Sequence, residues 1–217
     1  MVYVPTTYQI SPSSCHYYAS SCYLCRLIIE NVFLNIFNME HPLHLFRFCP
    51  RCGSNDFTEN DFKSKRCGAC GFVLYFNPQS ATVALIVNKR NELLVARRAK
   101  EPAKGTLDLP GGFADCFETG EEGVAREVLE ETGLVVTATK YLFSLPNIYV
   151  YSGFEEHTLD LFYLCTVQDD TLPAAHDDVE ELQWIPIEKL NAREFGLQSI
   201  RKGIEIFMKE YLETNRY

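Results

Sequence analysis

From Ser80 onward, apolar and polar residues follow patterns that predict a mixed α/β domain. Five short runs are rich in β-branched and other apolar residues, and each run has the length of a strand. The predicted strands cover residues 81–87, 93–97, 141–143, 159–167 and 182–185.

Two segments of the same region have helical spacing instead. Residues 120–132 predict a helix that begins after Thr119 as its N-cap and ends at Gly133. Residues 199–212 predict a second helix, because Ile200, Ile204 and Phe207 repeat at the spacing of one buried face. The stretch 173–178 between the last two elements is typical of an exposed loop.

Residues 46–76 differ from this domain because they carry two C-x-x-C-G turns separated by 14 residues. The four cysteines are Cys49, Cys52, Cys67 and Cys70. Two such turns offer four thiolates to one tetrahedral zinc ion, and the intervening stretch has the length of one hairpin. We therefore predict a zinc ribbon. Its Zn²⁺ is structural, since all four ligands come from the protein. The alternative, a redox C-x-x-C, lacks its usual βαβ context.

The first 38 residues form a third segment, in which Arg26 and Glu30 are the only charged residues. The composition becomes ordinary at Met39, so we hypothesise that translation begins there and that residues 1–38 have no designed fold. The alternative is an amphipathic arm, residues 24–37, that packs on a partner. The predicted organisation is an N-terminal extension (1–38), a zinc ribbon (39–78) and an α/β domain (79–217).

Composition narrows the class of protein. The 217 residues contain 20 Lys+Arg and 29 Asp+Glu, a net charge of −9, which argues against a broad nucleic-acid-binding surface and fits a protein that holds cations. The nine cysteines are an odd number and cannot form a fully paired disulfide framework. No apolar run approaches the roughly 20 residues that span a bilayer, and no signal peptide is recognisable, so we expect a cytoplasmic protein without a membrane partner.

The predicted helix 120–132 carries the clearest candidate chemistry. Glu127, Glu130 and Glu131 project from one helix face, where like charges repel unless a cation lies among them. Hard oxygen ligands of this kind favour Mg²⁺ or Mn²⁺ over zinc. The alternative is a solvated acidic face, although only Arg126 offers a positive charge among these glutamates.

Taken with the preceding loop, this helix resembles the Nudix box. The matching residues are Gly112, Glu118, Arg126, Glu127, Glu130, Glu131 and Gly133, with apolar Val128 and Leu134. The resemblance covers residues 80–190 and implies the Nudix α/β/α sandwich with a mixed sheet. It also implies hydrolysis of a nucleoside diphosphate linked to another group.

The resemblance further implies roles for single residues. It makes Glu127 and Glu131 the principal ligands of Mg²⁺ or Mn²⁺, with Glu130 in the same cluster and the Gly112 carbonyl as an additional ligand. It makes Glu118 and Arg126 a structural pair between the loop and the helix. The glycines have their own physical reason, since Gly112 lets backbone approach a cation and the diphosphate.

Other candidate residues keep two interpretations each. Asp178 stands at the acidic position of a loop that supplies the general base in some family members, or it belongs to an acidic surface turn. Arg97 and Arg98 contact substrate phosphate or form ordinary salt bridges. Tyr149 and Tyr151 stack on a base or pack in the sheet.

The order of a four-cysteine ribbon before a Nudix domain resembles the NAD(H) pyrophosphatase branch, whose members are often homodimers. That branch has S-Q-P-W-P-F-P-x-S after the box, whereas residues 144–152 read SLPNIYVYS. The substrate alternatives are therefore NAD(H), ADP-ribose or a related ADP-sugar, and a nucleoside triphosphate. A different class is a non-catalytic nucleotide sensor or nucleic-acid-binding protein, against which the intact set of carboxylates argues.

Overall fold

The computed structural model describes residues 40–169, 171 and 179–214. The chain divides into two compact units with the boundary between Phe76 and Asn77. The predicted 1–38 extension, the Met39 start and the 173–178 loop lie outside the described residues. Among those described, no helix is both long and apolar enough to cross a membrane.

The first unit is a small antiparallel sheet of β1 (Phe57–Asp61), β2 (Ser64–Cys67) and β3 (Val73–Tyr75). The register pairs Phe57 with Cys67 and Arg66 with Val73. Its core consists of Cys49, Phe57 and Cys67, with Cys70, Phe72 and Leu74 packed against them. Such a core is too small to support folding alone, which favours stabilisation by a metal.

The described residues of the second unit form two three-stranded sheets and two long helices. One sheet has the order β4 (Gln79–Ile86), β8 (Phe154–Val167), β7 (Val136–Tyr151), in which β4 and β8 are parallel. The other has the order β6 (Leu107–Asp108), β5 (Glu92–Arg98), β9 (Val179–Pro186) and is antiparallel. Two short 3₁₀ turns, η2 (Ile187–Lys189) and η3 (Ala192–Glu194), precede the last helix.

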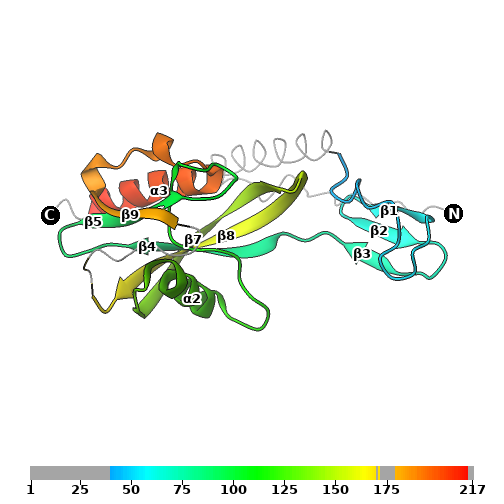
Figure 1. The fold of residues 1–217 in the computed structure, drawn as a ribbon, viewed down its shortest axis with the longest axis horizontal. Helices are drawn as coiled ribbons and strands as arrows, with labels where there is room; N and C mark the ends of the chain where they lie inside the picture. Colours follow the sequence, from blue (N-terminus) through cyan, green and yellow to red (C-terminus); the bar gives the residue numbers. More distant parts are fainter. Residues whose placement is uncertain (1–39, 170, 172–178, 215–217) are drawn as a thin grey trace, which may run out of the picture. The chain divides into compact units, whose positions relative to one another are not determined.

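Helices α2 (Gly120–Thr132) and α3 (Gln198–Thr214) lie on opposite sides of these strands (Figure 1). Val124 and Val128 of α2 pack in one hydrophobic core, and Ile200 and Ile204 of α3 pack in the other. This arrangement is an α/β/α sandwich with both parallel and antiparallel strand pairs, as the sequence predicted.

The segment that follows β6 joins the two sheets. The Thr82 backbone N–H donates to the Gly112 carbonyl at 2.7 Å, and the Ala84 N–H donates to Pro110 at 2.8 Å. Because β6 itself pairs with β5, the segment from β6 to Phe113 contacts one sheet at its start and the other at its end. The loop with the two glycines is thereby held beside β4.

Candidate active site

The ends of helix α2 are closed by local interactions. The Thr119 hydroxyl accepts a hydrogen bond from the Glu122 N–H, and the Glu122 carboxylate accepts one from the Thr119 N–H, which is a complete capping box. At the other end, Gly133 has a φ of 70° and its N–H donates to the Leu129 carbonyl. Both ends fall where the sequence predicted them, so the glutamates of α2 have defined positions.

The loop of Gly111 and Gly112 contacts the helix directly. The Gly111 N–H donates to Glu131 Oε2 at 3.0 Å, and Glu131 is only 9% exposed. Gly111 has a φ of 149°, and a Cβ there would lie 2.1 Å from the Thr82 carbonyl oxygen. A Cβ at Gly112 would lie 2.6 Å from a carboxylate oxygen of Glu127. Both glycines therefore stand where backbone approaches other groups closely.

A bidentate ion pair joins the loop to α2. Arg126 donates from Nη2 to Glu118 Oε1 at 2.7 Å and from Nε to Glu118 Oε2 at 3.1 Å. With the backbone N–H of Asp115, which also donates to Glu118, this arginine lowers the pKa of the Glu118 carboxyl to about 2. Glu118 is therefore ionised throughout the neutral range.

The same guanidinium also reaches two candidate metal ligands. Arg126 Nη1 donates to Glu127 Oε1 at 2.8 Å and to Glu130 Oε2 at 3.0 Å. Burial raises the pKa of Glu127. Arg126 thus partly neutralises the acidic face, and Glu131 turns instead toward the Gly111 amide.

The carboxylates of Glu127, Glu130 and Glu131 supply only oxygen ligands, as Mg²⁺ and Mn²⁺ require. In this structure they do not gather as closely as the cysteines described below. Within the described part of the chain, those cysteines are the only group of three or more His, Cys, Asp or Glu whose ligand atoms all lie within 4.8 Å of one another. The donor set fits a hard divalent ion, and Arg126 Nη1 occupies the space between two of the donors.

All three glutamates line a cavity of 380 Å³. Gly111, Gly112 and Phe113 form its wall beside β4. The remaining lining comes from strands β4 to β9, from α3 and from the connecting loops, so the cavity receives residues from both faces of the sandwich. Its lining includes Ala81, Thr82, Val83, Ala96, Arg97, Arg98, Lys100, Asp108, Leu109, Asp115, Asn147, Tyr149, Thr158, Asp160, Val179, Leu197 and Ile200.

The two candidate arginines are engaged by protein groups. Arg98 forms an ion pair with Asp108 and donates to the Pro102 carbonyl at 2.7 Å and to the Tyr149 hydroxyl at 3.1 Å. Arg97 lies 3.4 Å from Glu181 and donates to the Gly105 carbonyl at 2.7 Å. In this structure both arginines therefore have the contacts expected if they form ordinary salt bridges.

The other candidates are divided between the cavity and its surroundings. Tyr149 lines the cavity and meets Phe113 edge to face, with ring centroids 6.0 Å apart. Tyr151 does not line it and is 65% exposed at the end of β7. Asp178 lies outside the described residues.

Several polar residues of the cavity are not among the candidates from the sequence, and three of them are buried carboxyl or amide side chains. Asp108, Asn147 and Asp160 are each at least 92% buried. A signal existed for Asp160, because it is a charged residue inside a run of apolar strand positions. Asp160 lies near Asn147 because β7 pairs with β8. The predicted strand 141–143 was too short to include Asn147, so the sequence did not predict this proximity.

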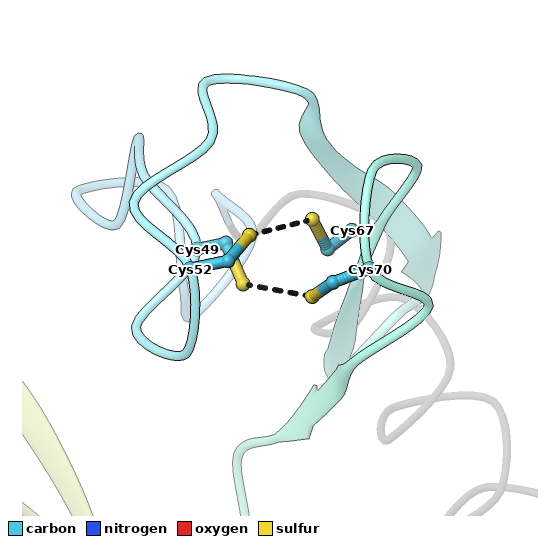
Figure 2. Close-up of side chains that lie close together, drawn as sticks. All are labelled: Cys49, Cys52, Cys67 and Cys70. Carbon is cyan, nitrogen blue, oxygen red and sulfur yellow. Dashed lines mark hydrogen bonds between the residues drawn. The ribbon is translucent and has the colours of Figure 1, made fainter.

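In the smaller unit, the four cysteines converge from two turns (Figure 2). The sulfur atoms of Cys49 and Cys70 lie 3.7 Å apart and those of Cys52 and Cys67 lie 3.6 Å apart. A tetrahedral zinc site with Zn–S bonds of about 2.3 Å has sulfurs about 3.8 Å apart, so these spacings fit one ion and exclude disulfides. The turns are closed by hydrogen bonds from Gly53 to Cys49 and from Gly71 to Cys67. The backbone N–H of Cys70 contributes most to lowering the pKa of the Cys67 thiol to about 7.

Comparison with known protein families identifies the larger unit. The NUDIX domain family matches residues 77–205. The chain therefore belongs to the Nudix family, as the box residues indicated.

Several curated proteins are similar to this chain. An ADP-ribose pyrophosphatase of Methanocaldococcus jannaschii is 35% identical over 133 residues, which are 59% of this chain and 74% of that protein. NAD-capped RNA hydrolases named NudC, from Vibrio parahaemolyticus and Vibrio cholerae, are 28% and 29% identical over 150 residues. These matches cover 69% of this chain and 55% and 53% of the relatives, so the chain spans about half the length of the NudC proteins.

Solved structures agree with this fold. A NUDIX hydrolase from Nitrosomonas europaea superposes with a TM-score of 0.58 at 20% identity, covering 77% of this chain and 93% of that one. A MutT NUDIX hydrolase from Burkholderia pseudomallei superposes with a TM-score of 0.52 at 27% identity, covering 59% and 97%.

Proposed function

We propose that this protein is a divalent-metal-dependent hydrolase that cleaves the diphosphate linkage of an ADP-ribose-type or NAD(H)-type nucleotide. The observation that carries the proposal is the set of box carboxylates, Glu127, Glu130 and Glu131, lining one 380 Å³ cavity together with the glycine loop. The ADP-ribose pyrophosphatase relative supports the same reaction class.

In this proposal, Glu127 and Glu131 are the principal ligands of Mg²⁺ or Mn²⁺, and Glu130 and the Gly112 carbonyl complete the set. Bound divalent ions would neutralise the diphosphate and activate water. Glu118 orients the helix through Arg126, as their bidentate contact supports. Asp178 is the candidate general base.

The reaction is attack of water on one phosphorus of the diphosphate. The bond between that phosphorus and the bridging oxygen breaks, and the bridging oxygen leaves with the second phosphate. For ADP-ribose the products are AMP and ribose 5-phosphate, and for NAD(H) they are AMP and nicotinamide mononucleotide. The chain contributes a fixed surface of carboxylates and a backbone loop that lets the diphosphate approach closely.

Two substrates remain candidates because separate observations favour them. The 35% identical relative is named an ADP-ribose pyrophosphatase. The NudC relatives are named NAD-capped RNA hydrolases, and the four-cysteine ribbon also resembles the NAD(H) pyrophosphatase branch.

The deciding experiment is turnover of ADP-ribose, NAD, NADH, NAD-capped RNA and nucleoside triphosphates by the full-length protein with Mg²⁺ or Mn²⁺. We expect metal-dependent release of AMP from ADP-ribose or NAD(H). Lack of hydrolysis of every diphosphate under both metals would refute the enzyme assignment.

For the smaller unit, we propose a structural Zn²⁺ held by Cys49, Cys52, Cys67 and Cys70. The sulfur spacings of 3.6 and 3.7 Å support it. Elemental analysis of the purified protein should find one zinc per chain.

A further inference from the structure

A buried polar cluster lies in the cavity, on the face of the sheet opposite to helix α2. Asp160 of β8 is 4% exposed and accepts hydrogen bonds from Thr158 Oγ1 at 2.6 Å and from the Ser199 hydroxyl. The Asn147 side chain of β7 also interacts with Asp160 and opposes the rise in its pKa that burial causes. Asp160, Thr158 and Asn147 all line the cavity.

Strand register explains why these residues meet. Asn147 pairs with Thr158, and Leu145 pairs with Asp160, across β7 and β8. Side chains two residues apart in a strand share a face, so Asp160 lies on the same face as Phe162. Phe162 packs in the core that contains α3, whereas Val124 and Val128 of the box helix pack in the other core. The cluster and the glutamates therefore enter the cavity from opposite faces.

The cluster is unsuited to phosphate. Asp160 and Asp108 both contribute carboxyl groups to this part of the lining, and carboxylate oxygens offer a phosphate no hydrogen-bond donor. Arg98 uses its guanidinium on Asp108, Tyr149 and Pro102. If the diphosphate occupies the glutamate end, the end with Asp160 receives a group without negative charge.

The surroundings of the cluster favour a planar ring. Apolar side chains line the cavity here, among them Val83, Leu109 and Ile200. A sugar would place hydroxyls against these walls, whereas a base presents apolar faces and confines its polar atoms to the edge. The Asn147 side chain lines the cavity and is 8% exposed.

We infer that Asp160 and Asn147 form a nucleobase subsite that selects a base with an exocyclic amino group, such as adenine. The inference rests on the proposed diphosphate hydrolysis for the position of the phosphates. Asp160 accepts a hydrogen bond from the amino group, and the Asn147 amide donates to the adjacent ring nitrogen, which is one of the two contacts that Asn makes to adenine in DNA. Thr158 and Ser199 hold the carboxyl group in place.

The test compares ADP-ribose with inosine diphosphate ribose, which replaces the amino group by a carbonyl and leaves the sugars and the diphosphate unchanged. The wild-type protein should prefer ADP-ribose by at least about tenfold in kcat/KM, as expected when a buried polar group is left unpaired. In Asp160→Asn the amide donates to the carbonyl, so the preference should fall about tenfold or reverse, mainly through KM.

Controls separate recognition from a structural role of Asp160. Glu155→Gln, an exposed change in the same strand, should keep the wild-type ratio. If Asp160 only held α3 through Ser199, Asp160→Asn would change both substrates equally and the ratio would stay constant, which would overturn the subsite. Asn147→Ala gives a second measurement of the ratio if Asp160→Asn does not fold, and an unchanged ratio there would likewise overturn it.

Calorimetric binding of AMP and IMP keeps the inference independent of turnover. If none of ADP-ribose, inosine diphosphate ribose and NAD(H) is hydrolysed, the proposed function fails. The subsite still requires tighter binding of AMP than IMP and a loss of that difference in Asp160→Asn. Equal binding of both nucleotides by the wild-type protein would contradict it.

Discussion

Arg126 donates two parallel hydrogen bonds to the Glu118 carboxylate, from Nη2 to Oε1 at 2.7 Å and from Nε to Oε2 at 3.1 Å. The pair connects helix α2 to the loop before it. The remaining guanidinium nitrogen, Nη1, contacts Glu127 and Glu130. One arginine therefore both positions the helix and contacts one oxygen of Glu127 and one of Glu130, two of the carboxylates that we propose as metal ligands.

The Glu118 pair should make stability depend on pH in the acid range. The pKa of the Glu118 carboxyl falls from an ordinary value of 4.5 to about 2 in the folded protein. A carboxyl with a lowered folded pKa stabilises the fold fully above its unfolded pKa, and this contribution is lost as the pH falls toward the folded pKa. Glu118→Gln should therefore unfold at lower urea than wild type at pH 7, and the difference should shrink between pH 4.5 and 2.

Glu155→Gln is the control for this measurement, since Glu155 is exposed and lies outside the cavity. It should show little difference from wild type at any pH. A gap between Glu118→Gln and wild type that stays constant down to pH 2 would show that the ion pair is not its source.

The carboxylates of α2 should be needed for turnover and not for folding. Glu131→Gln retains an oxygen that can accept the Gly111 N–H but loses the negative charge, so kcat should fall by at least about 100-fold with little change in thermal unfolding. Glu121→Gln, an exposed change on the same helix, should leave kcat close to wild type. Mn²⁺ binding measured by calorimetry should weaken in Glu131→Gln and not in Glu121→Gln. A Glu131→Gln variant with wild-type kcat would refute the role of Glu131 as a metal ligand.

How far the sequence predicted the fold depended on how local the signals were. Helix α2 was predicted to the residue because Thr119 and Gly133 end it by interactions within the helix itself. Strand β7 was predicted as residues 141–143 and instead covers Val136–Tyr151. Pro146 lies in its middle, and proline is usual evidence against a strand. Here β7 is at the edge of its sheet, where a missing N–H is tolerated.

The candidate site was predictable in the same uneven way. Helical spacing places Glu127, Glu130 and Glu131 together, and all three line the cavity. The sequence did not predict the contacts that depend on the pairing of strands distant in the chain. Asp108 meets Arg98 through the pairing of β5 with β6, a strand of two residues that no periodicity reveals.

Loss of zinc should affect the two units differently. Cys67→Ser removes one of four sulfurs from a unit whose buried core consists of Cys49, Phe57 and Cys67, so the ribbon should unfold. The glutamates belong to the other unit and should still support hydrolysis with added Mg²⁺. Elemental analysis, hydrogen exchange of residues 40–76 and kcat measured on one preparation check this. Loss of turnover while residues 77–214 keep their exchange protection would show that the ribbon contributes to the active site.

Alanine should impair the protein for different reasons at Gly111 and at Gly112, the two glycines of the loop beside β4. Gly111 has a φ of 149° and its new Cβ would meet the Thr82 carbonyl at 2.1 Å, a backbone atom that cannot move aside. Gly111→Ala should therefore destabilise the fold by about 1–3 kcal/mol or more. At Gly112 the Cβ meets the flexible Glu127 carboxylate instead. Gly112→Ala should keep most of its stability and lose turnover because Glu127 is displaced. Urea unfolding and kcat for both variants separate the two effects, and equal loss of stability would contradict the assigned contacts.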